Sequence, residues 1–98
     1  MVICSASPVP ASLLPPGCII YDLGEYISHK IGMSPEKIAA QSADRFAIVE
    51  AEALRDIIVT SEIASTDAAV TLLPSTLLNP ECERLVRSHC TFYNTDNY

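Results

Sequence analysis

Hydrophobic residues recur every three or four positions through the middle of the chain, between Ser34 and Val59. This spacing places them along one side of an α-helix and leaves the charged residues mainly on the other side. We therefore expect this stretch to form the helical centre of the core. The residues on its predicted apolar side are Phe46, Val49, Ala53, Leu54, Ile57 and Ile58.

Capping residues predict where this helical stretch begins and where it is interrupted. Ser34 can accept a hydrogen bond from a free backbone N–H, and Pro35 suits the first helical position. Glu36 lies in the first turn, where the helix dipole favours an anion. Residues 42–44 weaken a helix and predict a break or a turn. Either one kinked helix or two helices can therefore occupy residues 35–60.

Three further helices are predicted on the same grounds. The first covers residues 18–31 and ends at Gly32, which suits the left-handed conformation after a helix. The second is a short helix within residues 65–74. The third begins with Asn79 as its cap and Pro80 in its first position. These elements predict an all-α fold, a small bundle of about five short helices with an extended Pro-rich N-terminal arm.

The two ends of the chain differ in composition from its centre. Proline and small residues dominate residues 1–17, which predicts an extended arm, either a poorly ordered terminus or a docking arm. Its X–Pro bonds can be cis or trans and are candidate substrates of a prolyl isomerase. The expected organisation is an arm (1–17), a helical domain (18–90) and a polar tail (91–98). The candidate partner contacts in the arm are Pro8, Pro10, Pro15 and Pro16.

Composition bounds the class of protein. The chain has 98 residues, which is enough for one small domain, and 49% of them are hydrophobic. That fraction is high for so small a chain, whose core can bury only part of it. We therefore expect apolar surface to remain for a partner or a second copy. No apolar run is long enough to span a membrane, and the N-terminus lacks the basic region of a signal peptide. The sequence therefore predicts a cytoplasmic protein.

Charge argues against a nucleic-acid partner. The formal net charge is −6, and an acidic protein is repelled by phosphate. The stretch from Asp44 to Asp67 holds six acidic and two basic residues. We predict that its polar side is an exposed protein-interaction face, whose candidate residues are Glu50, Glu52, Arg55 and Asp56; a solvated helix face is the alternative.

Catalytic and metal-binding patterns are absent from the sequence. No nucleophile has a neighbouring base, and there is no Gly-rich phosphate loop, so we expect neither an enzyme nor a cofactor. The cysteines have no C-x-x-C spacing, which disfavours a metal site and favours free thiols in a reducing cytosol. Disulfides would join Cys4 to Cys18 and Cys82 to Cys90 only in an exported protein. The candidate ligands weighed were these four cysteines together with His29 and His89.

The order of several short motifs resembles the lambda-repressor-like helix-turn-helix family, and the HigA-type antitoxins in particular. The resemblance covers roughly residues 16 to 87. It implies a helix-turn-helix scaffold that dimerises, binds its own operator and neutralises a toxin. The matching segments are Pro16-Gly17, Gly32-Met33-Ser34, Ile38-Ala39, Leu54 to Ile58, Ser65 to Leu72 and Asn79-Pro80-Glu81.

Two departures from this family change the expected function. The segment between Ile38-Ala39 and Val49 is about five residues longer than the turn of the family allows. Acidic residues also stand where a DNA reader presents Arg, Lys, Asn or Gln. The size and acidic character are similar to those of anti-RecBCD accessory proteins of lambdoid phages. We therefore predict a non-enzymatic protein-binding module, a phage-type inhibitor of a host DNA-processing enzyme such as RecBCD, with the HigA-type antitoxin or repressor as the alternative.

Overall fold

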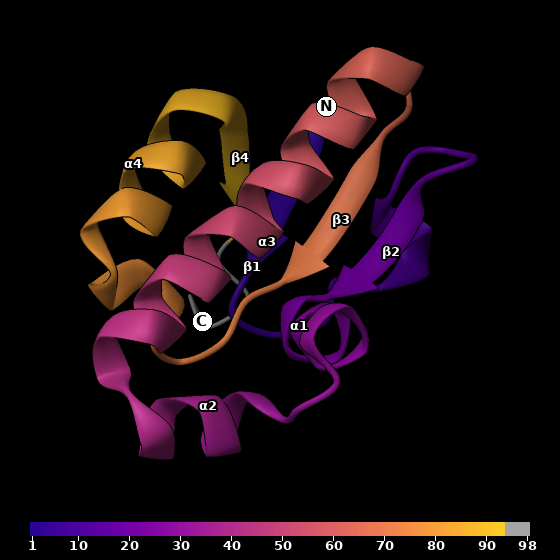
Figure 1. The fold of residues 1–98 in the computed structure, drawn as a ribbon. Helices are drawn as coiled ribbons and strands as arrows, with labels where there is room; N and C mark the ends of the chain where they lie inside the picture. The colour runs from indigo at the N-terminus through magenta and orange to yellow at the C-terminus, as the bar shows by residue number, and fades with distance from the viewer. Residues whose placement is uncertain (94–98) are drawn as a thin grey trace.

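A four-stranded parallel β-sheet lies at the centre of the fold, in a computed structural model that describes residues 1–93 (Figure 1). The strands are β1 (Val2–Ser5), β2 (Ile19–Asp22), β3 (Ala68–Thr71) and β4 (Cys90–Tyr93). The helices are α1 (Leu23–Ile31), α2 (Pro35–Gln41), α3 (Ala43–Ala64) and α4 (Pro80–His89). Two short 3₁₀ helices, η1 (Ala11–Leu13) and η2 (Thr76–Leu78), lie in the connections.

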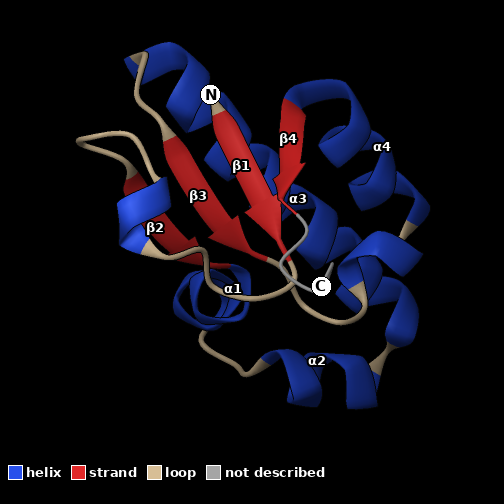
Figure 2. Cartoon of the chain, turned by 180° about the vertical axis from the view of Figure 1, so that it is seen from behind, coloured by secondary structure: helices blue, strands red, loops and turns tan. Residues whose placement is uncertain are grey.

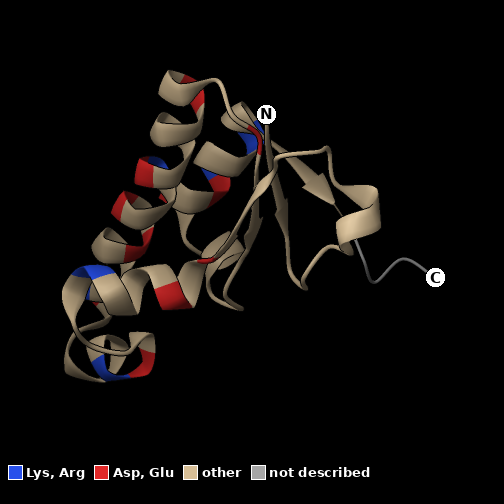
Figure 3. Cartoon of the chain, turned by 90° about the vertical axis from the view of Figure 1, so that its right-hand side faces the viewer, with Lys and Arg blue, Asp and Glu red and all other residues tan. Residues whose placement is uncertain are grey.

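The strands are ordered β2-β3-β1-β4, so the N-terminal strand is inside the sheet. Val2 is in register with Ala68 on one side and with Cys90 on the other. The long helix α3 and the C-terminal helix α4 pack on one face of the sheet, and α1 and α2 lie beyond the ends to which the strands point (Figures 1 and 2). The other face carries no α-helix, and η1 lies on that side (Figures 2 and 3).

The prediction of an all-α bundle is wrong, because four segments assigned to the arm, to helices or to the tail are strands. The expected first helix begins as strand β2 and becomes helical only from Leu23. The short helix expected within residues 65–74 is strand β3. A buried parallel strand is a continuous apolar run, and over four residues such a run has no period that separates it from a buried helix. Tail residues 91–93 belong to β4, and the rest of the predicted tail lies outside the described residues.

The predicted helix boundaries in the centre of the chain are confirmed. The Ser34 hydroxyl accepts a hydrogen bond from the Lys37 N–H at 3.3 Å, and Pro35 begins α2. Ser42 ends α2 and caps α3, where its hydroxyl accepts from the Arg45 N–H at 3.2 Å. Residues 35–60 therefore form two helices rather than one. The extended backbone of Ser42 turns the chain between the two helices. Its hydroxyl supplies an acceptor for a backbone N–H that has no partner within the first turn of α3.

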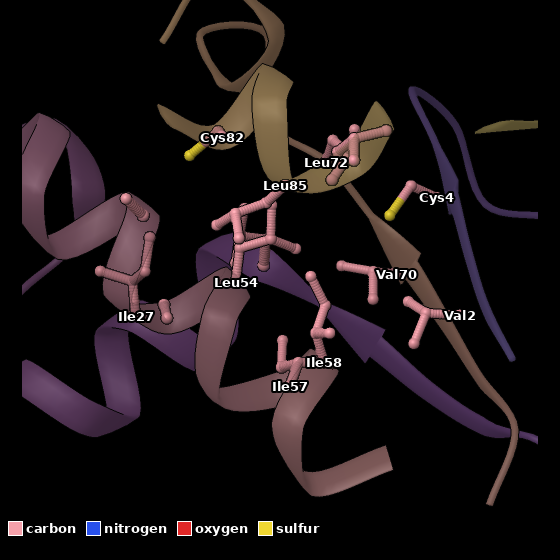
Figure 4. Close-up of a cluster of buried hydrophobic side chains, with 14 of the residues drawn as sticks. Val2, Cys4, Ile27, Leu54, Ile57, Ile58, Val70, Leu72, Cys82 and Leu85 are labelled. Carbon is pink, nitrogen blue, oxygen red and sulfur yellow. The ribbon is translucent and has the colours of Figure 1, made fainter. Parts of the chain in front are cut away.

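The core lies between α3 and the sheet (Figure 4). Leu54, Ile57 and Ile58 are at most 2% exposed and face Val70, Val2 and Cys4 of the strands. Five of the six residues on the predicted apolar side of α3 are buried, and the sixth, Phe46, packs against the cluster. Within residues 1–93, no helix combines the length and the hydrophobicity needed to cross a membrane.

The predicted Pro-rich arm is not a free extension. Its first part is strand β1, and residues 6–18 form the connection that carries the chain from β1 to β2. Pro8, Pro10 and Pro16 are exposed, and Pro15 is half-buried. All peptide bonds of the described residues are trans. The role of these prolines in binding a partner or a prolyl isomerase stays a prediction.

Candidate functional site

A buried carboxylate connects the long helix to the segment before α4. Glu50 is only 1% exposed, so the predicted exposed face does not include it. Its Oε2 atom accepts hydrogen bonds from the hydroxyls of Ser75 at 2.8 Å and Thr76 at 3.0 Å. Its Oε1 atom accepts from the Asn79 side-chain amide at 3.1 Å. Three neutral donors thus satisfy a charge that would be costly to bury alone.

Asn79 extends this connection in two directions. Its side-chain amide also donates to the Ala47 carbonyl at 2.9 Å, and its side-chain oxygen accepts from the Glu81 N–H at 3.2 Å as the cap of α4. The start of α4 is therefore held against the first half of α3. Sequence reasoning identified the cap but missed the buried network. The available signal was the group of polar residues 75, 76 and 79 within an otherwise apolar segment.

A groove of about 540 Å³ opens beside this network, between α3 and the start of α4. Ile48 is 61% exposed at the groove, although a large apolar side chain gains by burial. Exposed apolar surface rimmed by polar groups is typical of an interaction site. The apolar part of the lining is Ala47, Ile48, Ala51 and Pro80, and the polar part is Glu52, Arg55, Asn79 and Glu81.

Charged residues line one side of this α3–α4 groove. Arg55 lies 3.3 Å from the Glu81 carboxylate, which also pairs with Arg84. Hydrogen bonding to the Arg84 guanidinium, with a further contribution from Arg55, lowers the pKa of Glu81. Among residues 1–93, Glu52 has no ion-pair partner within 4 Å. The groove thus presents one carboxylate that is available to a basic group.

The predicted interaction face is therefore divided by the structure. Glu52 and Arg55 line the groove together, whereas Asp56 is turned towards α1 and pairs with Lys30. Hydrogen bonding to Asp56 raises the pKa of Lys30. The grouping of Asp56 and Glu50 with the other two residues is corrected, because one is engaged by α1 and the other is buried. Consecutive helical positions point about 100° apart, so near neighbours along α3 meet different surroundings.

The carboxyl edge of the sheet is a second location where ligands could bind. The connections that follow β1 and β3 leave in opposite directions, and in doubly wound sheets such a point is where ligands bind. Here the segment after β1 reads SASPVP and lacks the glycine-rich pattern that approaches phosphate. The Ser5 hydroxyl donates to the Ser7 carbonyl, and the Leu72 N–H donates to the Ser5 carbonyl at 2.8 Å. Local contacts therefore use the polar groups of Ser5 at this edge.

The four cysteines are free thiols, and two of them shift each other's pKa. Hydrogen bonding between the thiols of Cys4 on β1 and Cys90 on β4 lowers the pKa of Cys90, while the same interaction and burial raise the pKa of Cys4. Burial, with nearby carboxylates, raises the pKa of Cys82 to about 12. In the described part of the chain, no three His, Cys, Asp or Glu side chains are grouped as a metal site.

We expect Cys90 to be the first thiol alkylated by iodoacetamide in the native protein at about pH 8, because the thiolate is the reactive form. Cys4 and Cys82 are fully buried and should react only after unfolding in urea. Cys18, whose pKa is raised by burial and by Asp67, should react more slowly than Cys90. Peptide mass spectrometry over time measures the order. Faster labelling of Cys18, or no slowing of Cys90 by Cys4→Ala, would contradict the lowered pKa of Cys90 and its cause.

The resemblance to helix-turn-helix proteins stays a prediction without support from comparison. The segment from Ser65 to Leu72, which the resemblance matches to a helix, contains strand β3 instead. Comparison of the chain with protein-family models, with curated proteins and with solved structures gives no match.

Proposed function

We propose that the chain is a non-enzymatic protein-binding module and that its docking site is the α3–α4 groove. The observation that supports this proposal is the exposed Ile48 side chain, held beside charged residues on two helices that a buried network fixes in place. A rigid site loses little entropy on binding, and an apolar centre with a polar rim is the usual arrangement of an interface.

The groove favours a partner segment with an apolar anchor next to basic residues. Ile48 and Ala51 offer apolar contact, and the Glu52 carboxylate offers a partner for lysine or arginine. The net charge of −6 adds a longer-range attraction to a basic surface, which increases the association rate. An amphipathic helix lying in the groove would present residues of both kinds at a spacing of three or four.

A host DNA-processing enzyme, such as RecBCD, remains our proposal for the partner. Enzymes that bind DNA present basic surfaces to phosphate, and an acidic protein can compete for such surfaces. The same charge disfavours direct binding of nucleic acid by this chain. No feature of the α3–α4 groove favours the antitoxin alternative.

The first test uses a synthetic amphipathic helix of leucine and lysine as the probe. We expect it to shift the backbone amide NMR signals of Ala47, Ile48, Ala51 and Glu52. Ile48→Asp should weaken binding about tenfold or more, because a charge replaces the apolar contact at the centre of the site. Ile63→Asp is the matched control, since Ile63 is 81% exposed on the same helix outside the groove.

Specificity is tested with charge. A helix of leucine and glutamate should bind more weakly than the lysine probe, and Glu52→Lys should reduce this difference. Glu62→Lys, an exposed change on α3 outside the groove, should leave the difference nearly unchanged. Signal shifts spread over the acidic surface, or equal losses for Ile48→Asp and Ile63→Asp, would reject the α3–α4 groove as the docking site.

A further inference from the structure

Strand β4 is the last strand of the sheet, and its outer edge pairs with no other strand of residues 1–93 (Figure 2). Natural proteins normally protect such an edge with charged residues or proline, or cover it. The sequence of β4, CTFY, contains no charged residue and no proline, and Thr91 and Phe92 are exposed. The composition of β4 therefore leaves its edge unprotected against pairing with another extended segment.

Backbone pairing within the sheet shows which groups of β4 point outwards. The Ser5 carbonyl accepts a hydrogen bond from the Leu72 N–H at 2.8 Å, so Ser5 faces β3. Backbone groups of successive residues in a strand point to opposite sides, so Cys4 faces β4. Phe92 is in register with Cys4, and in a parallel pair the bonds run to the residues before and after the partner in register. The N–H and carbonyl of Phe92 therefore point away from the sheet.

A groove of about 310 Å³ lies beside this edge, between α4 and β4. The Phe92 side chain lies on this helical side of the sheet, because its partner in register, Cys4, belongs to the core. Glu83 and Arg87 in the lining form an ion pair with each other at 2.8 Å, so this α4–β4 groove has little net charge and suits an apolar side chain. The apolar part of its lining is Leu77, Val86, Cys90 and Phe92.

We propose that the edge of β4 and the α4–β4 groove bind an extended peptide segment of a partner protein, which adds a strand to the sheet. The outward N–H and carbonyl of Phe92 pair with the peptide backbone, and alternate side chains of the peptide enter the groove. A strand fits both features, whereas a helix has no free backbone groups along its length. The segment therefore carries an apolar residue at every second position. No residue of this site lines the α3–α4 groove.

Amide hydrogen exchange measured by NMR tests the backbone pairing. In the free protein, the outward Phe92 amide should exchange faster than the Thr91 amide, which faces β1. The probe is a synthetic peptide in which leucine alternates with threonine, with a lysine at each end. At saturation it should slow exchange of the Phe92 amide about tenfold or more. It should also slow alkylation of Cys90 in the groove by iodoacetamide and leave Cys18 on the far side of the sheet unaffected.

Two controls separate the backbone contribution from the side-chain contribution. A peptide of the same sequence, methylated at its interior backbone nitrogens, keeps the side chains but loses the donors, so it should bind about tenfold more weakly or worse. Leu77→Asp places a charge in the groove and should weaken the unmodified probe by a similar factor. Leu78→Asp is the matched control, since Leu78 is the next residue, is 83% exposed and lies outside the lining.

Three results would overturn the proposal: a Phe92 amide that exchanges as slowly as that of Thr91 in the free protein, equal binding of the two peptides, or equal losses for Leu77→Asp and Leu78→Asp. The first result would mean that the chain itself or a second copy already covers the edge. The test is independent of the α3–α4 groove, because Ile48→Asp should leave binding of this probe unchanged. Loss of binding in Ile48→Asp would place the peptide in the α3–α4 groove instead.

Discussion

Replacing Glu50 with alanine is expected to lower the free energy of unfolding by about 3 kcal/mol. The substitution removes the acceptor of the hydrogen bonds from Ser75, Thr76 and Asn79 and leaves a cavity at a position that is 1% exposed. A buried donor without a partner costs about 1–3 kcal/mol, and half-buried Ser75 recovers part of this from water. For a domain of this size the loss corresponds to a fall in Tm of about 12–24 °C.

Thermal unfolding followed by circular dichroism measures this effect, with two comparison variants. Glu50→Gln keeps the shape and one acceptor atom, so it should lose less stability than Glu50→Ala. Glu52→Ala removes the same group two residues away at an exposed position and should change stability by about 0.5 kcal/mol or less. Equal melting temperatures for Glu50→Ala and Glu52→Ala would show that Glu50 is not the buried anchor described above.

Leu54→Ala is expected to cost about 3 kcal/mol for a different reason. Leu54 is fully buried between α3, the sheet and α4, among the side chains shown in Figure 4. Truncation removes apolar contacts and leaves a cavity that the surroundings fill only in part, which typically costs 2–5 kcal/mol. Urea denaturation should show a lower midpoint with an unchanged slope, because the surface exposed on unfolding hardly changes.

Ile63→Ala is the matched control for Leu54→Ala. Ile63 lies on the same helix but is 81% exposed, so its truncation should have little effect on the midpoint. A cost below about 1 kcal/mol for Leu54→Ala would contradict the packing of α3 on the sheet. A changed urea slope would indicate a less compact native state instead of a simple cavity.

The stability of the Glu50 network also limits which variants can test the groove. Asn79 donates to both Glu50 and Ala47, so the loss of Glu50 removes one of the two hydrogen bonds that hold this wall of the groove. Weaker probe binding by Glu50→Ala would therefore follow from a structural change, without direct contact. Ile48 and Glu52 are exposed, and their substitution changes the contact surface without removing a buried hydrogen bond. They are the informative positions for binding.

The fold class was predicted incorrectly because the sheet depends on contacts between distant residues. Val2 pairs with Ala68 and with Cys90, far along the chain. Nothing local distinguishes strand β2 from the first turn of a helix, since Ile19 and Ile20 continue the apolar spacing of α1. Short apolar runs such as those of β1 and β3 also cannot be told from buried helix segments by periodicity.

The candidate site was predicted in part. Glu52 and Arg55 do line a groove, but Glu50 was expected on the surface because an isolated carboxylate is rarely buried. Its burial requires three donors from the segment between β3 and α4. No local rule brings residues 75–79 to α3. Ile48, an exposed apolar residue of the groove lining, was not identified because a single apolar residue on a polar helix face has no distinctive pattern.

The sequence by itself determined the helices that depend on near neighbours. Ser34, Ser42, Asn79 and Gly32 mark helix ends through bonds and backbone angles within a few residues, and the apolar side of α3 follows from the helical period. Only the tertiary structure decided the parallel sheet, the burial of Glu50 and the α3–α4 groove. Each of these arises where segments distant in sequence meet, and the free energy of such contacts depends on partners that local spacing does not specify.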